Sequence, residues 1–120
     1  MTVSVQHLTD EAFCYLTTTG RISGRPHTIE IWFALNGQTL YMLSGGMDRA
    51  DWVKNGQHQP EVTVRIKQTI FTGRLRLVDD LAEDALARQL VGEKYQKAEE
   101  DLDEWLRSAL PVAVDLLSEK

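Results

Sequence analysis

Two arginines and two glycines stand close together in the stretch TTTGRISGRPHTIEIWF at residues 17–33. Glycine lets backbone N–H groups approach a ligand oxygen closely, and an arginine guanidinium grips phosphate or carboxylate in a two-pronged fork. Ser23 adds a hydroxyl donor between Arg21 and Arg25. The pattern indicates an anion-binding loop. The alternative is a solvated loop whose arginines form surface ion pairs.

A second stretch, SGGMDRADW at residues 44–52, has related chemistry. Ser44, Gly45 and Gly46 come just before a predicted helix, and a helix start presents unpaired N–H groups and the positive end of the helix dipole to an anion. Ser-Gly-Gly is also an ordinary turn. Two anion sites flanking one hairpin favour a binding function more than either does alone.

Several other side chains have both a binding and a structural interpretation. Trp52 could stack on a flat ring or pack a short helix onto the sheet. We expect Asn55, directly before Gly56, to lie near the end of that helix. An apolar stripe at helical spacing indicates a buried helix face or a dimer contact, and it consists of Tyr95, Leu102, Trp105 and Leu106.

The familiar catalytic motifs are missing from the sequence. There is no P-loop, no dinucleotide-binding G-x-G-x-x-G and no G-x-S-x-G elbow around Ser44. His7, His27 and His58 lack metal-ligand spacing, so no metal site is expected. Cys14 is interpreted as a small buried hydrophobe. If the protein is an enzyme, a bound cofactor supplies its reactivity.

The elements that must position these residues follow from periodicity. Residues 8–19 are predicted to form a short helix that begins after Thr9 and ends at Gly20. Residues 28–35 alternate as a strand, Asn36-Gly37 suits a type I′ turn, and residues 38–44 return as its hairpin partner. A short helix capped by Asp48 should then end at Asn55-Gly56.

The second half of the chain predicts two more strands and then helices. Residues 61–67 and 69–78 alternate as antiparallel neighbours, and helical spacing runs from Leu81 to Leu106 with a break at Gly92. Pro111 should stop the helix, and residues 112–114 could add a last strand. Short connections require antiparallel pairing, so the predicted fold class is α+β, a mainly antiparallel β-barrel with peripheral helices.

Composition limits the partners of the chain. We expect its 120 residues to form a single domain spanning 1–120. A net charge of −5 argues against a general nucleic-acid binder. No apolar run approaches the length of a membrane span, and one cysteine allows no intrachain disulfide. We expect a cytoplasmic protein without an integral membrane segment.

Three segments together carry a family resemblance: YLTTTGRISGRPHTIEIWF, LYMLSGGMDRADWVKN and PEVTVRI. They resemble the deazaflavin-dependent nitroreductase family, within the split β-barrel superfamily of FMN-binding, pyridoxamine-phosphate-oxidase-like proteins. The resemblance covers residues 15–78. Two departures concern the cofactor contacts: Gly56 and Gln59 replace the family's usual Leu and Asn, and His27 stands where a basic residue often follows the loop proline.

The resemblance implies a split-barrel homodimer that binds coenzyme F420, with FMN as the alternative. The residues it assigns to the cofactor are Arg21, Ser23, Arg25, His27, Ser44, Gly45, Gly46, Trp52 and Asn55. It implies hydride transfer to an electron-poor small molecule such as a quinone, enone or nitro compound. The catalytic side chain is unknown, with Tyr95 and Ser44 as candidates. The rival functions are an FMN-binding oxidoreductase and a non-catalytic protein that carries or sequesters the cofactor.

Overall fold

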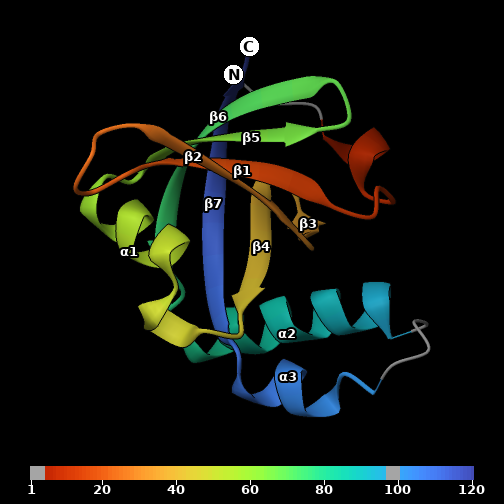
Figure 1. Cartoon of the computed structure of the whole chain (residues 1–120). Helices are drawn as coiled ribbons and strands as arrows, with labels where there is room; N and C mark the ends of the chain where they lie inside the picture. The colour runs from red at the N-terminus through yellow and green to blue at the C-terminus, as the bar shows by residue number, and fades with distance from the viewer. Residues whose placement is uncertain (1–4, 97–100) are drawn as a thin grey trace.

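Alternating buried and exposed side chains build one antiparallel sheet in the strand order β2-β1-β5-β6-β7-β4-β3. The computed structural model describes residues 5–96 and 101–120 (Figure 1). The strands are β1 (Cys14–Thr19), β2 (Pro26–Ile31), β3 (Ala34–Asn36), β4 (Thr39–Ser44), β5 (Glu61–Ile66), β6 (Thr69–Leu77) and β7 (Leu110–Glu119).

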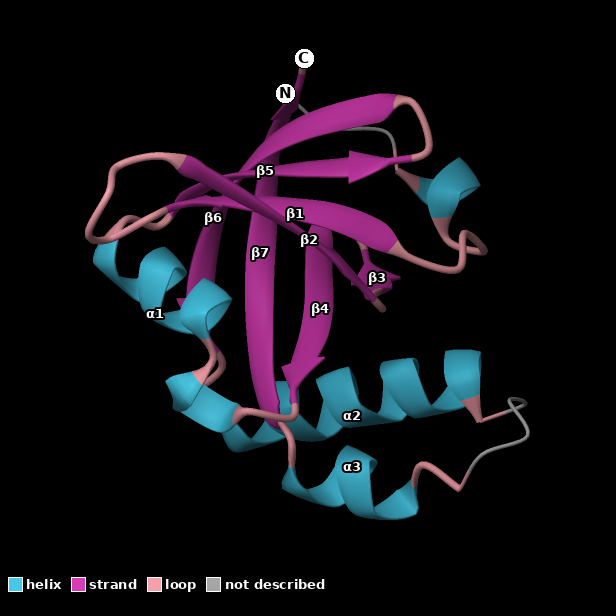
Figure 2. Ribbon diagram, viewed as in Figure 1, coloured by secondary structure: helices cyan, strands magenta, loops and turns pink. Residues whose placement is uncertain are grey.

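The sheet curls so that β1 and β2 cross β4 and β7 at a steep angle (Figure 2). The core lies inside this curl, where Leu16, Val64, Phe71 and Val114 are fully buried. Burying a side chain of this size contributes about 1.5–3 kcal/mol relative to leaving it exposed. The free edges of the curled sheet are β2 and β3, so the structure is a half-barrel with two open edges. The predicted fold class, a mainly antiparallel split β-barrel with peripheral helices, is confirmed.

The helices lie at the ends of the sheet (Figure 1). They are the 3-10 turns η1 (Gln6–Leu8) and η2 (Met47–Arg49) and the α-helices α1 (Asp51–His58), α2 (Leu81–Tyr95) and α3 (Asp103–Ser108). Helix α2 packs Ala87 against Tyr41 and Ala113 on the outer face of β4 and β7. Among residues 5–96 and 101–120, no helix combines the length and the apolar character that a membrane crossing requires.

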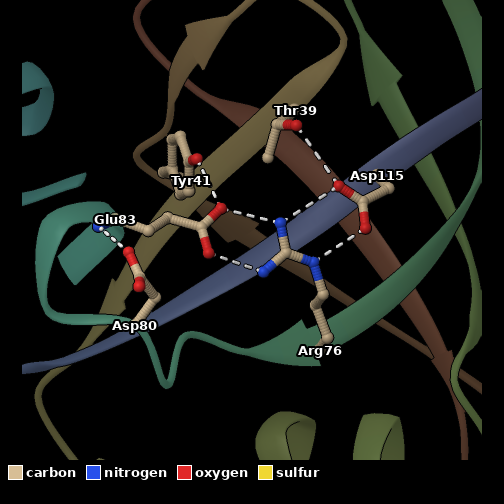
Figure 3. Close-up of polar contacts among 6 residues, drawn as sticks. All are labelled: Thr39, Tyr41, Arg76, Asp80, Glu83 and Asp115. Atoms are coloured by element: carbon tan, nitrogen blue, oxygen red, sulfur yellow. Dashed lines mark hydrogen bonds and ion pairs between the residues drawn. The ribbon is translucent and has the colours of Figure 1, made fainter. Parts of the chain in front are cut away.

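A polar network fastens α2 to three strands (Figure 3). The guanidinium of Arg76 on β6 donates two hydrogen bonds of 2.7 Å to Glu83 on α2 and one of 2.8 Å to Asp115 on β7. The Tyr41 hydroxyl of β4 donates to Glu83 at 2.7 Å, and Asp80 caps the helix by accepting from the Glu83 amide. The arginine lowers the pKa of Glu83 to about 2.

The predicted helix over residues 8–19 is wrong in the structure. Only η1 is helical there, and β1 occupies the second half as a strand paired with β2 on one side and β5 on the other. Its burial alternates from Cys14 to Thr19 with a period of two. The threonines at 17–19 are β-branched and favour an extended backbone, and the two strand partners override the local helical spacing.

The predicted strand over residues 28–35 is two strands in the structure. Its first part, β2, pairs with β1, and only β3 forms the hairpin with β4. The break falls at Phe33, whose amide donates to the Tyr95 hydroxyl at 3.0 Å and whose carbonyl accepts from Lys94 Nζ at 2.9 Å. Helix α2 thus supplies the hydrogen bonds that a neighbouring strand would have made.

Three further boundaries differ from prediction. Asn55 and Gly56 lie inside α1, which begins after Ala50 and not at Asp48. The helical region from Leu81 ends at Tyr95, and α3 starts separately at Asp103. The hairpin turn has positive φ at Gly37 alone, with Asn36 and Thr39 paired, so the type I′ prediction is wrong. Strands β5, β6 and β7 confirm the remaining strand predictions.

Candidate functional site

A pocket of about 510 Å³ opens between the loop at residues 20–25, the start of β2 and helix α1. Its lining includes a set of side chains predicted for cofactor binding, namely Arg21, Ser23, His27, Trp52 and Asn55. Arg25 belongs to the same loop but does not line the pocket, and its side chain is exposed. The structure therefore brings together residues from two segments that are about thirty positions apart.

The loop between β1 and β2 is a tight turn that depends on its glycines. The Gly20 amide donates to the Arg25 carbonyl at 2.8 Å, and the Gly24 amide donates to the Gly20 carbonyl at 2.9 Å. Gly24 has a φ of 74°, which side-chain-bearing residues rarely adopt. A Cβ on Gly20 would lie 2.6 Å from Nε2 of His27, so any larger residue would push the imidazole away.

Asn55 joins this loop to α1 and β1 from a buried position. Its Oδ1 accepts from the Arg21 amide at 3.2 Å and from Arg21 Nη1 at 2.8 Å, while its Nδ2 donates to Oγ1 of buried Thr18 at 3.3 Å. Only 4% of Asn55 is exposed. The position of Asn55 before Gly56 predicted a helix end and did not reveal that its side chain connects the loop to α1 and β1. A buried amide side chain makes such bonds because leaving it unpaired is costly.

The donors of the loop differ in how far they are already occupied. Arg21 uses one arm for Asn55 and points Nη2 at Asp51, 3.2 Å away. The Arg25 side chain has no hydrogen-bond or ion-pair partner among the residues that the structure describes. Within the same residues, the amides of Ile22 and Ser23 also lack an acceptor. These three groups are available to an anionic ligand.

The pocket lining also includes two apolar side chains from outside the loop. Ile29 of β2 and Trp52 of α1 are partly buried, pack against the core and line the pocket. An indole and an aliphatic side chain suit a planar ring, and the loop donors suit a phosphate or carboxylate. The residues present therefore fit a cofactor that combines a ring with acidic groups. No group of His, Cys, Asp or Glu in the described parts of the chain is arranged to hold a metal ion.

The turn at Ser44, Gly45 and Gly46 lies outside this pocket. The Ser44 hydroxyl is buried and donates to the Met47 carbonyl at 2.8 Å. Gly46 precedes the three-residue turn η2, so the turn is not the start of α1 as expected. A Cβ on Gly45 would lie 3.5 Å from the Trp105 indole, which places this turn beside α3.

Tyr95, the other candidate for catalysis, is engaged in structural contacts. Besides accepting from the Phe33 amide, its hydroxyl lies 2.7 Å from the Ala12 carbonyl, to which it can donate. Its ring stacks on Trp32 at a centroid distance of 4.3 Å. Burial raises the Tyr95 pKa to about 12, so the phenol stays protonated at neutral pH. It does not line the pocket at the loop.

Lys94 has a perturbed environment that sequence reasoning did not detect. Its ammonium group lies 3.6 Å from the centroid of the Phe33 ring and is half-buried. Burial lowers its pKa to about 8. A lysine in the last turn of a helix is common, so no local signal marks it. It lines a different pocket, of about 390 Å³, with Asp10 and Glu93.

A curled antiparallel sheet with two free edges and helices at its periphery is the split β-barrel fold. The family of F420H(2)-dependent quinone reductases matches residues 2–116, and the chain belongs to this family. The protein is therefore an F420-dependent enzyme. The resemblance to F420-dependent split-barrel reductases is confirmed.

Solved structures share the fold at low sequence identity. An F420 reductase superposes with a TM-score of 0.67 at 15% identity, over 100% of this chain and 98% of that one. A FAD-binding protein from Mesorhizobium loti superposes with a TM-score of 0.73 at 17% sequence identity, over 99% of this chain and 92% of that one. A candidate pyridoxamine 5′-phosphate oxidase from Listeria innocua has a TM-score of 0.70 at 17% sequence identity, over 94% of this chain and 90% of that one. No curated protein matches the chain.

Proposed function

We propose that the protein transfers a hydride from reduced F420 to an electron-poor small molecule, with a quinone as the leading acceptor and an enone or nitro compound as alternatives. Family membership supports the quinone. The observation that carries the proposal is the pocket at the loop, whose lining combines the residues Ile22 and Ser23, with their free amides, and the apolar side chains of Ile29 and Trp52. The reduced deazaflavin supplies the hydride when bound, and the chain supplies binding and orientation.

Each part of the pocket has a proposed task. Arg25 and the amides of Ile22 and Ser23 bind acidic groups of the cofactor, while Asn55 holds the loop in place through Arg21. Trp52 orients the ring through the apolar part of the lining. His27 and Ser23 contribute polar contacts at the pocket rim. Gly45 and Gly46, which are exposed, offer backbone donors to a part of the cofactor that extends beyond the pocket.

We propose that neither Ser44 nor Tyr95, the two candidates from the sequence, acts as the catalytic side chain. The Ser44 hydrogen bond to Met47 and the Tyr95 contacts with Ala12 and Phe33 occupy both hydroxyls. Developing negative charge on an acceptor would instead be met by positioned backbone N–H groups. We accordingly propose that the protein contributes to rate through orientation and hydrogen bonding and uses no dedicated acid.

The test is a fluorescence titration of Arg25→Ala with F420 at low and moderate salt. Removing a free guanidinium that grips an anion should weaken binding about 10-fold or more at low salt, because charge-assisted hydrogen bonds contribute roughly 1.5–3 kcal/mol. The matched control is Arg74→Ala, since Arg74 is exposed and paired with Glu61 on another strand. Unchanged affinity in Arg25→Ala, with an intact circular dichroism spectrum, would refute the anion-binding role of this loop.

An FMN-dependent oxidoreductase is the second candidate function. The FAD-binding protein from Mesorhizobium loti shows that this fold also accommodates a flavin. The same titration with FMN separates the two, because a protein of this second kind binds FMN more tightly than F420. Tight binding of either cofactor without oxidation of its reduced form, across a panel of quinones, enones and nitro compounds, would instead indicate a carrier.

We also propose a homodimer in the cytoplasm. Ile22, which lines the pocket, is 92% exposed and Leu117 on β7 is 58% exposed, and a second copy that covered them would remove apolar surface from water. The buried Cys14 is the one cysteine in the chain and suits a reducing compartment. Sedimentation equilibrium tests the dimer, and a monomer at micromolar concentration would contradict it.

A further inference from the structure

The pocket proposed to hold an anionic cofactor also contains a carboxylate. Asp51 is the first residue of α1, its side chain is 84% exposed, and it lines the pocket together with Arg21. An acid in the first turn of a helix is favourable for the helix dipole, which gives Asp51 a structural reason to be there. The Asp51 carboxylate also contacts Arg21, and this contact affects how the pocket binds an anion.

The guanidinium of Arg21 is divided between two partners of different kinds. Nη1 is held by Asn55, which is buried and also binds the Arg21 amide, so that arm is fixed. Nη2 faces Asp51 at 3.2 Å at the solvent-exposed rim. An exposed pair of this kind is weak, and water or another anion can replace the carboxylate at little cost.

An anion that enters the pocket therefore meets a competitor already bound to the outer arm of Arg21. To gain that arm, the anion must displace Asp51 and tolerate its negative charge nearby. A ligand that also gains contacts elsewhere, from the apolar side chain of Trp52 and from the loop donors, can offset this cost. A small free anion has fewer such contacts.

We propose that Asp51 is a competing carboxylate that holds the outer arm of Arg21 until an anionic ligand displaces it. This inference rests on the proposed function of the pocket as a cofactor site. Asp51 weakens the binding of every anion at this arm, and a ligand with additional contacts stays bound despite that loss. Arg21 is then shared between loop positioning, through Asn55, and ligand binding, through the arm that Asp51 occupies.

The experiment compares wild type, Asp51→Asn and the matched control Asp48→Asn. Asp48 is also exposed and lies three residues earlier, but it neither lines the pocket nor contacts Arg21. Each protein is titrated with F420 and FMN by fluorescence and with inorganic pyrophosphate by ¹H–¹⁵N chemical shifts of the loop amides. Asp51→Asn should bind F420 and pyrophosphate about two- to fivefold more tightly at low salt, with the gap closing near ~0.5 M salt.

The outcomes separate this inference from the proposed function. Equal affinities in wild type and Asp51→Asn, an equal gain in Asp48→Asn, or weaker binding in Asp51→Asn would each overturn the role of Asp51. If neither F420 nor FMN binds wild type while pyrophosphate still binds Asp51→Asn more tightly, the proposed function fails and the competing carboxylate stands. Absence of any pyrophosphate shift in the loop of both proteins overturns the inference.

Discussion

The Tyr95 hydroxyl forms hydrogen bonds with the backbone of Phe33, in the gap between strands β2 and β3. Strand pairing stops at Phe33, and the phenol accepts from the Phe33 amide while lying within reach of the carbonyls of Ala12 and Phe33. Its ring is stacked on Trp32, which holds the hydroxyl in place. These contacts inside the protein account for the side chain, which the family resemblance had made a candidate for catalysis.

Tyr95→Phe separates these two roles. Removing the hydroxyl leaves the Phe33 amide without its acceptor in a buried position, so the free energy of unfolding should fall by about 1–3 kcal/mol. The affinity for F420 should stay within twofold of wild type, because Tyr95 does not line the cofactor pocket. Urea unfolding and the fluorescence titration measure the two quantities. A fully stable variant that binds F420 but has lost most of its turnover would assign Tyr95 to the chemistry instead.

At the scale of elements, helix α2 is fastened to the sheet through one glutamate. Glu83 accepts from Arg76 and Tyr41 and so connects the helix to β6 and β4 (Figure 3). Arg76 lowers the pKa of Glu83 from the ordinary 4.5 to about 2. Because the folded-state pKa is the lower one, this contribution to stability is present above pH 4.5 and is lost as the pH falls toward 2.

Glu83→Gln should remove this pH dependence. Between pH 7 and pH 3, wild type should lose roughly 1 kcal/mol more unfolding free energy than the variant, a value kept small because the network is partly open to solvent. Urea unfolding at the two pH values gives the comparison. Glu104→Gln, at an exposed position on α3, is the control and should follow wild type. Parallel losses in wild type and Glu83→Gln would show that the ion pair has no net effect.

The strands that the sequence predicted correctly carry their signal locally. Strands β5 and β6 alternate apolar and polar residues and are joined by a short turn, so neighbouring positions contain the information. The helical spacing around Phe13 and Leu16 was misleading because the strand there is fixed by pairing with β2 and β5. The break at Phe33 depends on Tyr95, 62 residues away, which no local pattern reveals.

The candidate site divides in the same way. The anion-binding chemistry of the loop at residues 20–25 could be predicted because glycine, arginine and serine offer donors to an anion in any fold. The bond between Asn55 and Arg21 spans 34 residues and could not be predicted. The sequence predicted that Gly56 ends the helix, but Gly56 lies inside α1. A Cβ at this position would come within 2.6 Å of the Leu75 side chain on β6. Close packing of the helix on the sheet, and not a turn, requires this glycine.

At the scale of the whole molecule, β7 joins the two halves of the sheet. It pairs with β6 on one side and with β4 on the other, and its side chains Val112 and Val114 are fully buried in the core. Strands β6 and β4 have no pairing with each other in the strand order. The last strand in the sequence is therefore an interior strand of the sheet, with neighbours on both sides.

Deleting residues 110–120 should abolish cooperative folding. The two halves of the sheet would lose their shared strand and much of the core between them, so we expect no sigmoidal transition in thermal circular dichroism. Deleting Lys120 alone is the control: it removes one hydrogen bond, from its amide to the Ile70 carbonyl, and should preserve the transition. A cooperative transition in the shorter chain would show that the other six strands form an independent unit.

The two free edges of the sheet are neighbours in the chain. Strand β2 ends at Ile31 and β3 begins at Ala34, with only Trp32 and Phe33 between them. Three residue steps span at most about 11 Å, so the edges cannot separate further at this point. The short link therefore fixes the end of β2 close to the start of β3, whereas the loop that carries Arg21 and Arg25 lies at the other end of β2, away from this constraint.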